Sequence, residues 1–251
     1  MKITVVTLFP ELVEAVAQSG MPRVAVERGA LSLQTINPRM FAADRHRTVD
    51  DRPFGGGPGM LLKPEPLAAA IEAAKAEAPS APVWLLSPQG ARLDRDRVAD
   101  LAQQAGVVLV CGRYEGVDQR VIDRLIDAEI SIGDYVLSGG ELGAMVLIDA
   151  VARRLPGVLG DAESVAQDSF EAALLDHPHY TRPEDWSGQR VPPVLLGGNH
   201  RAIDAWRSSQ RVQNTARHRP DLFYGQGLDA RARAELTATW APEAPWQTNE
   251  P

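Results

Sequence analysis

Three short turns rich in glycine and other small residues are the parts of this sequence best suited to hold a ligand. They read LLSPQG at residues 85–90, VCGRYEG at 110–116 and SIGDYVLSGG at 131–140, and each includes or follows an apolar, strand-like run. Glycine has no Cβ, so its backbone can approach a ligand closely. Backbone N–H and C=O groups at such turns suit a ring edge that offers both donors and acceptors, as adenine does.

Each of these turns could also be an ordinary connection between a strand and a helix. In a parallel α/β sheet, however, ligands bind beyond the carboxyl ends of the strands, where neighbouring turns lie together. Three such turns after three consecutive apolar runs therefore favour one shared pocket over three unrelated loops.

The glycine motifs that bind phosphate in common nucleotide-binding folds are missing. No G-x-G-x-x-G follows the first apolar run, and GGGPGMLLK at residues 55–63 lacks the G-K-[ST] ending of a P-loop. Pro58 also removes a backbone donor. This segment is either a flexible loop or a surface of close approach, and a general phosphate-dependent enzyme is disfavoured.

His177 and His179 are spaced closely enough to suggest a metal ion. Prolines occur around this pair, and a packed turn explains the pattern better, so we assign no metal ligand. The single cysteine, Cys111, excludes a disulfide framework and a zinc site built from several thiolates.

The first 155 or so residues alternate between strand-like and helix-like segments. Strands are predicted at residues 3–9, 31–36, 83–86, 107–111 and 129–132. Helices are predicted at residues 10–19, 64–78, 93–104, 117–126 and 141–155, with Gly20 ending the first. This alternation is typical of an α/β domain with a largely parallel sheet.

The alternation ends near Pro156. Residues 156–170 form a loop-like segment with an acidic, small-residue centre, GDAESVAQDS, as in an interdomain linker. Helices are predicted again at residues 199–217 and 229–240. We therefore expect an α/β domain at residues 1–159, a linker at 160–172 and a mostly helical domain at 173–251.

The net charge of −7 argues weakly against binding to nucleic acid, but the charge is uneven. Residues 181–220 contain seven arginines and three acids, which leaves +4 with the histidines neutral. This basic segment could attract phosphate groups. The apolar run after Lys2 is too short for a signal peptide or a membrane span, so we expect a soluble, cytoplasmic protein with no membrane contact.

Several blocks of the sequence together resemble the bacterial tRNA (guanine-N1)-methyltransferase family of knotted (SPOUT) methyltransferases. The blocks are DRPFGGGPGM, LSPQG, GRYEGVDQRV, SIGDYVLSGGE, PGVLG, DSF, LLDHPHYTRP and VPPVLLGGNH, in order between Lys2 and about Leu222. The resemblance implies methyl transfer from S-adenosylmethionine to N1 of guanosine 37 of tRNA, next to the anticodon. It also implies magnesium, a deep trefoil knot in the parallel α/β domain, a helical C-terminal domain that binds tRNA, and a homodimer with its active site at the interface.

The resemblance assigns the cofactor to the three turns, and Glu115 would face its cationic end. The implied contacts are Leu86, Ser87, Pro88, Gly112, Tyr114, Glu115, Gly116, Ile132, Gly133, Asp134, Tyr135, Val136, Leu137, Gly139 and Gly140. Gly143 departs from the family, in which proline is common at this position. We expect a looser turn there, with weaker cofactor binding.

Two catalytic residues follow from the same resemblance. Asp168 would be the general base that removes the N1 proton, and Arg153 would stabilise negative charge on O6. From the residues alone, Asp168 suits an N-cap before a helix, and Arg153 and Arg154 suit the C-terminal end of a helix dipole. For Arg154 we expect only this role at the end of the helix, with no part in catalysis. Because Asp168 lies in the predicted linker, we expect tRNA to order the segment.

Aromatic rings and arginines near the C-terminal basic segment suit tRNA. The implied contacts are Ser169, His179, Tyr180, Arg182, Asn199, His200 and Arg207. Trp206, at helical spacing from Ile203, is expected to be a packing residue. Two alternatives stay open: a knotted methyltransferase that acts on another RNA position or on ribose, and a protein that binds nucleotide or RNA without chemistry.

Overall fold

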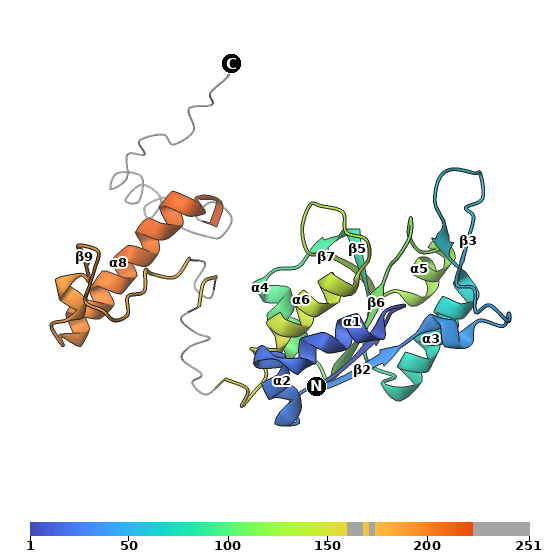
Figure 1. Cartoon of the computed structure of the whole chain (residues 1–251), viewed down its shortest axis with the longest axis horizontal. Coiled ribbons are helices and arrows are strands. Elements are labelled where there is room, and N and C mark those ends of the chain that lie inside the picture. Colours follow the sequence, from blue (N-terminus) through green and yellow to red (C-terminus); the bar gives the residue numbers. More distant parts are fainter. Residues whose placement is uncertain (160–167, 171–173, 223–251) are drawn as a thin grey trace, which may run out of the picture. The chain divides into compact units, whose positions relative to one another are not determined.

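The computed structural model describes residues 1–159, 168–170 and 174–222 (Figure 1). The chain divides into two compact units, Met1–Ala162 and Glu163–Pro251. The predicted linker is described only at residues 168–170, and the helix predicted at 229–240 lies outside the described residues. In the described ranges, no helix combines the length and hydropathy needed to span a membrane.

The first unit alternates strands and helices, as the sequence predicted. Its elements are β1 (Lys2–Val6), α1 (Pro10–Glu14), the short 3₁₀ helix η1 (Ala15–Gln18), α2 (Gly20–Glu27), β2 (Ser32–Ile36), η2 (Pro38–Phe41), β3 (Asp50–Asp51), β4 (Leu61–Leu62), α3 (Pro64–Glu77), β5 (Val83–Arg92), α4 (Arg95–Ala102), β6 (Gly106–Cys111), α5 (Gln119–Leu125), β7 (Ala128–Ser131) and α6 (Glu141–Ala152).

Five of these strands form one parallel sheet in the order β2-β1-β6-β5-β7. Alternate side chains of a strand point to opposite faces, and in β6 both sets are buried. Its residues Val107, Leu109 and Cys111 join one core cluster with α1, α2, α4 and α6, while Val108 and Val110 join another with α3 and α5. Helices therefore cover both faces of the sheet, which explains the nearly continuous apolar runs (Figure 1).

Two predictions about this unit were incomplete. Gly20 does end the first helical segment, but a further helix, α2, begins there, because Gly20 adopts a φ of +61° that redirects the chain. The strand predicted to end at Leu86 resumes at Ala91, since both residues pair with Ile130 of β7. Residues 87–90 thus leave the ladder as a bulge at the end of the sheet.

The second unit is described mainly by one long helix and the segment before it. It contains the strands β8 (Asp185–Trp186) and β9 (Gln189–Arg190), the 3₁₀ turn η3 (Pro193–Leu195) and helix α8 (His200–His218). The α8 helix matches the prediction for residues 199–217, and the Asn199 side chain caps it by accepting from the Ala202 N–H. Trp206 of α8 is half-buried near the rings of His177 and Tyr180, which confirms it as a packing residue.

Candidate functional site

A pocket of about 310 Å³ lies where β5, β6 and β7 end. All three glycine-bearing turns line it, so the prediction of one shared site is confirmed. Its lining includes every predicted cofactor contact except Asp134, whose side chain is exposed and outside the lining. A pocket of this size falls in the range that encloses a small organic ligand.

Backbone contacts bring the three turns together. The Leu93 N–H, which follows the β5 bulge, donates to the Ser131 carbonyl oxygen at 2.7 Å. The Gly140 N–H donates to the Gly112 carbonyl oxygen at 3.0 Å. A Cβ at Gly140 would lie 2.8 Å from the Cα of Cys111, closer than real Cβ contacts, so this crossing requires glycine.

A buried ion pair lies behind the third turn. Arg113 Nε donates to Glu141 Oε2 at 2.9 Å, and the Glu141 side chain is only 1% exposed. Glu141 Oε1 accepts a hydrogen bond from Thr7 Oγ1 at 2.8 Å. The Arg113 guanidinium lies 4.2 Å from the centroid of the Phe9 ring and donates to the Ser138 carbonyl oxygen. These contacts join the ends of β1 and β6 to the third turn and hold the pocket in shape.

The sequence prediction gave Arg113 and Glu141 no role. An acid at the start of a helix is usually exposed and interacts with the helix dipole, so its burial here could not be read from spacing. The sequence offered one signal for this ion pair: Arg113 lies in the second glycine-rich turn, and Glu141, of opposite charge, directly follows the third. Burial, followed by the negative charge of Glu141, also raises the pKa of the Cys111 thiol well above its usual range, so this cysteine stays protonated.

The second turn is fixed to the glycine-rich segment 55–59. The Glu115 N–H donates to the Met60 carbonyl oxygen at 2.9 Å, and the Leu62 N–H donates to the Gly116 carbonyl oxygen at 3.0 Å. A Cβ at Gly59 would collide with the Glu115 side chain. Gly59 is therefore a point of close approach rather than part of a loop without contacts. The group that approaches it is the Glu115 side chain and not a ligand.

Tyr114 sits in this turn with a φ of +60°, a backbone conformation that is strained for a residue with a side chain. Desolvation, and after it the charge of Asp50, raises the pKa of Tyr114. Its hydroxyl therefore remains protonated at neutral pH, and it interacts with Asp50 and Arg39.

Gly143 lies in the first turn of α6 rather than in the third glycine-rich turn, and its effect on cofactor binding stays a prediction. It lies within α6 and is buried. A Cβ there would meet only the Leu86 side chain, at 3.2 Å, which is a flexible neighbour. The third turn ends before Gly143, so its backbone does not depend on the residue at this position.

Arg153 lies at the opposite end of α6 from the pocket. Gly140 and Gly143 line the pocket at the start of the helix, and Arg153 is its C-cap, an exposed residue. The twelve residues of α6 span about 18 Å at 1.5 Å per residue. Within one chain, Arg153 is therefore about one helix length from the pocket.

Asp168 is half-buried, and its backbone environment does not fit an N-cap. Phe170 has a φ of +77°, whereas the second residue after an N-cap takes right-handed helical dihedrals. The Phe170 N–H also donates to the Leu174 carbonyl oxygen at 2.7 Å, opposite to the direction of helical hydrogen bonds. The interpretation of Asp168 as the cap of a helix beginning at Ser169 is therefore wrong.

The predicted tRNA contacts lie on two parts of the second unit. Asn199, His200 and Arg207 belong to the N-terminal half of α8 or its cap, and Arg207 pairs loosely with Asp204 at 3.8 Å. His179, Tyr180 and Arg182 lie on the exposed segment before β8. The Tyr180 ring is 6.3 Å from Trp206 of α8, so helix and segment pack together there.

Ser169 has a structural partner, because its Oγ accepts a hydrogen bond from the Asp176 N–H at 3.0 Å. Burial alone would raise the pKa of Asp176, but hydrogen bonds from the His179 ring and the His177 N–H lower it overall. The Asp176 carboxylate is therefore ionised at neutral pH.

A parallel sheet with helices on both faces, and a backbone-lined pocket beyond its carboxyl ends, defines an α/β protein that binds a small molecule at the edge of the sheet. The family model described as tRNA (Guanine-1)-methyltransferase TrmD matches residues 1–225. The chain thus belongs to the tRNA (guanine-1)-methyltransferase family, a family of enzymes whose reaction implies S-adenosylmethionine.

Curated relatives agree over nearly the whole length. The chain is 57% identical over 236 residues to the tRNA (guanine-N(1)-)-methyltransferase of Halorhodospira halophila, covering 94% of this chain and 89% of the relative. It is 54% identical over 250 residues to that of Burkholderia multivorans, covering 98% and 92%. It is 55% identical over 245 residues to that of Burkholderia mallei, covering 96% and 90%.

Proposed function

We propose that this protein methylates N1 of guanosine in tRNA, that S-adenosylmethionine is the donor, and that the target is guanosine 37. The observation that carries the proposal is the pocket formed by the three turns, together with membership of a family named for this reaction. The methyl donor bears its own leaving group on sulfur and supplies the activated methyl group.

The pocket fits such a donor. Its volume is about 310 Å³, and its lining combines apolar side chains such as Leu86 and Ile132 with backbone N–H and C=O groups of the turns. Glu115 supplies a carboxylate for a cationic end group. The buried Arg113–Glu141 pair keeps these groups in position.

For the chemistry, Asp168 is the proposed general base. The guanine N1–H is a poor nucleophile, and a carboxylate within hydrogen-bond reach of it contributes about 10²–10⁴-fold to the rate. As N1 loses its proton, negative charge moves to O6, where the guanidinium of Arg153 would stabilise it. Asp168 is half-buried, as a base that must be partly shielded from water would be.

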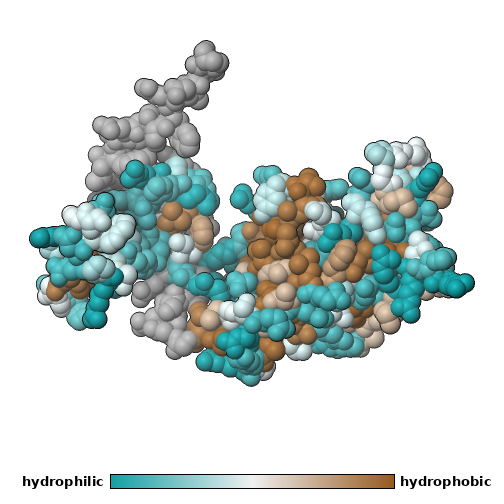
Figure 2. Space-filling model, viewed as in Figure 1, coloured by the Kyte–Doolittle hydropathy of each residue, from teal (hydrophilic) through white to brown (hydrophobic). Residues whose placement is uncertain are grey.

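The proposed homodimer follows from the position of Arg153. A residue about one helix length from the pocket of its own chain reaches a reaction centre only if another chain contributes. An exposed apolar patch on the first unit suits a second copy of this chain (Figure 2). It includes Phe9, Leu12, Val136, Leu142 and Val146, which are between 39% and 86% exposed.

Two inactive variants test the shared site. Gly140→Ala would block the pocket, and Asp168→Asn would remove the base. If pocket and base come from different chains, re-equilibrating equal amounts of the two variants restores roughly a quarter of wild-type activity, because half of the dimers then contain one intact site. No recovery would mean that pocket and base belong to one chain.

The deep trefoil knot is also part of the proposal. Its support is the contact of segment 131–140 with both the β5 bulge and the turn after β6, through the Leu93–Ser131 and Gly112–Gly140 hydrogen bonds. Arg113 and Gly139 also form an isolated antiparallel bridge.

The magnesium requirement stays a prediction. In the described part of the pocket no group of three carboxylate or histidine ligands occurs, so the residues do not supply a magnesium cage. We assign no step to the ion. Loss of activity in EDTA that magnesium restores would support the requirement.

The experiment for the function is methyl transfer from labelled S-adenosylmethionine to unmodified tRNA transcripts that differ only at position 37. We expect label on the guanosine-37 transcript and none on the adenosine-37 transcript, with N1-methylguanosine as the product after digestion. Label on ribose, or equal label on both transcripts, would support another RNA target. Cofactor binding without label on either would support a binding protein.

A further inference from the structure

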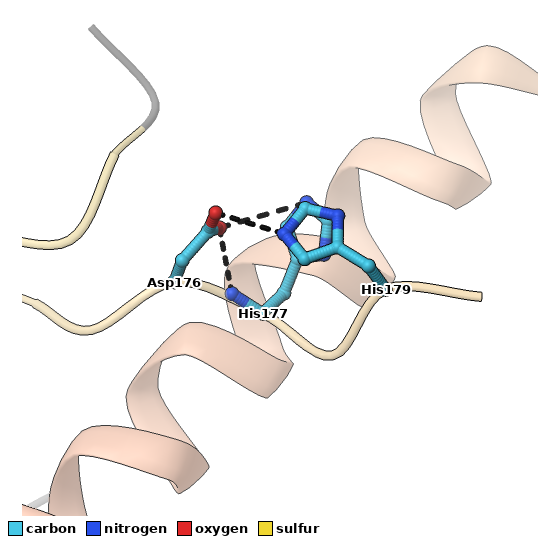
Figure 3. A group of neighbouring side chains, drawn as sticks. All are labelled: Asp176, His177 and His179. Carbon is cyan, nitrogen blue, oxygen red and sulfur yellow. Dashed lines mark hydrogen bonds and ion pairs between the residues drawn. The ribbon is translucent and has the colours of Figure 1, made fainter. Parts of the chain in front are cut away.

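A cluster of one carboxylate and two imidazoles lies in the second unit, outside the pocket. Asp176, His177 and His179 each offer one ligand atom, and these atoms lie within 4.8 Å of one another (Figure 3). Across the described ranges, no other group of three or more histidine, cysteine or acidic side chains comes as close. The proposed methyl transfer does not use this cluster as a unit.

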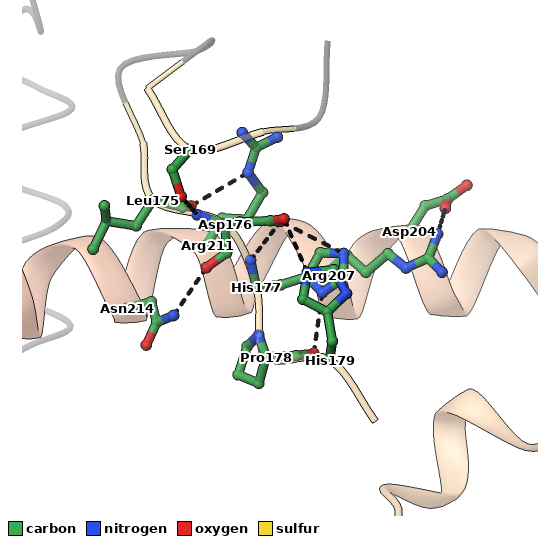
Figure 4. Close-up of polar contacts among 10 residues, drawn as sticks. All are labelled: Ser169, Leu175, Asp176, His177, Pro178, His179, Asp204, Arg207, Arg211 and Asn214. Atoms are coloured by element: carbon green, nitrogen blue, oxygen red, sulfur yellow. Dashed lines mark hydrogen bonds and ion pairs between the residues drawn. The ribbon is translucent and has the colours of Figure 1, made fainter. Parts of the chain in front are cut away.

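The backbone that carries the carboxylate is held in place (Figure 4). The Asp176 N–H donates to Ser169 Oγ at 3.0 Å, and the Asp176 carbonyl oxygen accepts from Asn214 Nδ2 of α8 at 2.9 Å. The preceding Leu175 N–H donates to Thr215 Oγ1 at 2.8 Å. The Asp176 carboxylate therefore projects from a backbone segment that is held against α8, which favours preorganised binding.

His177 is oriented as a ligand. Its side chain is 10% exposed and lies beside Trp206, with ring centroids 6.2 Å apart. Its Nδ1 lies 3.1 Å from the Pro178 carbonyl oxygen, which can only accept, so the ring is oriented by an Nδ1–H donor. The Nε2 atom faces Asp176 Oδ1 at 3.8 Å.

The space between His177 Nε2 and Asp176 Oδ1 is large enough for a cation. His177 Nε2 and Asp176 Oδ1 are 3.8 Å apart, a separation close to that of two ligand atoms on one metal ion. An N–H···O=C bond such as that of His177 Nδ1 orients the ring of most metal-binding histidines. His179 Nε2 lies 2.9 Å from Asp176 Oδ2, and its side chain is 70% exposed, so this ring can move while the other two ligands stay fixed.

We propose that Asp176, His177 and His179 bind one divalent transition-metal ion of the zinc type through Oδ, Nε2 and Nε2. Two imidazole nitrogens and one carboxylate oxygen suit zinc and disfavour magnesium, which prefers oxygen ligands. Bonds of about 2.0–2.2 Å in a tetrahedral site bring ligand atoms to about 3.3 Å from each other, so the cluster needs only a small contraction. The fourth position faces solvent on the side of the exposed His179.

Zinc binding to the full-length, tag-free protein tests the proposal. We would remove metal with a chelator and titrate Zn²⁺ in competition with a chromophoric chelator, without tRNA or S-adenosylmethionine. One equivalent should bind per chain in the micromolar range or tighter, and Mg²⁺ should not compete. His179→Ala should weaken zinc binding about tenfold or more. Loss of a group that only supports a ligand lowers metal affinity by about 10–100-fold, and loss of the ligand itself should lower it at least as much.

The matched control is His46→Ala, which removes an exposed histidine from the first unit. It should bind Zn²⁺ as the wild type does. His177 is buried, so His177→Ala is interpreted only if its circular dichroism matches the wild type, whereas the exposed His179 carries the test without that risk. Cobalt substitution should give a tetrahedral absorption spectrum in wild type and His46→Ala, and not in His179→Ala. Absence of saturable zinc binding, or equal binding by His179→Ala and wild type, would overturn the proposal.

Discussion

The two units of this protein use different parts of the chain for function. In the first unit, the pocket lies where three glycine-bearing turns meet, and its shape depends on glycines that cross other strands closely and on a buried ion pair. In the second unit, the predicted contacts are mostly exposed side chains on α8 and the segment before it. Substitutions should therefore have large effects on structure and cofactor binding in the first unit and small, graded, salt-dependent effects in the second.

The largest effect is expected from Glu141→Ala. It leaves Arg113 without its buried partner, and removal of one member of a buried pair costs about 3–5 kcal/mol. Urea unfolding of the full-length protein should show this loss. The control is Thr7→Val, which removes the hydrogen bond to Glu141 and the one that Thr7 Oγ1 accepts from the Phe9 N–H but keeps the ion pair, and should cost about 1–2 kcal/mol. Equal free energies of unfolding for Glu141→Ala and wild type would contradict the claim that the first unit depends on this ion pair.

Next comes a comparison of two glycines in the same region. In Gly140→Ala, the new Cβ would lie 2.8 Å from the Cys111 Cα, and such overpacking costs about 1–3 kcal/mol and displaces the pocket wall. In Gly143→Ala, the Cβ meets only the flexible Leu86 side chain, and alanine gains about 1 kcal/mol over glycine in a helix.

Isothermal titration with S-adenosylmethionine measures the difference. Binding should be lost or strongly weakened in Gly140→Ala and nearly unchanged in Gly143→Ala. Similar affinities for the two variants would contradict a pocket shaped by the crossing at Gly140.

The smallest effect is expected in the second unit, from Arg207→Ala. Arg207 is 44% exposed and only loosely paired with Asp204, so it is available to a phosphate. Its removal should weaken tRNA binding by about 1 kcal/mol and reduce the slope of log affinity against log salt by about 1. Filter binding at several salt concentrations measures both. Arg190→Ala, which removes an equal charge that pairs with Asp185, is the control. A matching loss in that variant would mean that general charge, rather than Arg207, attracts the RNA.

How much the sequence could predict also differs between the units. The parallel sheet and the pocket followed from apolar runs and from glycines at their ends, because both patterns are local. The Arg113–Glu141–Thr7 network was missed, since it joins residues that are 134 positions apart at its extremes. The β5 bulge was missed because Ser87-Pro88 resembles the end of a strand, and only pairing with β7 extends β5 to Arg92.

In the second unit, the sequence identified α8 correctly but could not decide between two meanings of its polar residues. Asp168 matched a capping pattern, and the positive φ of Phe170 excludes that meaning. The spacing of His177 and His179 suggested either a metal ion or a packed turn. The structure shows the packed turn, because His177 is only 10% exposed and lies beside Trp206, whereas a bound metal ion stays a proposal.

The most direct test of the proposed reaction is single-turnover methyl transfer to guanosine-37 tRNA by Asp168→Asn, with S-adenosylmethionine affinity measured on the same protein. The pocket belongs to the first unit and the proposed base to the second, so the substitution should leave cofactor affinity unchanged. Transfer should fall by about 10²–10⁴-fold, with partial recovery at high pH as the N1 proton is lost to solvent. Transfer within about threefold of wild type would contradict Asp168 as the base, because a general base contributes far more than that.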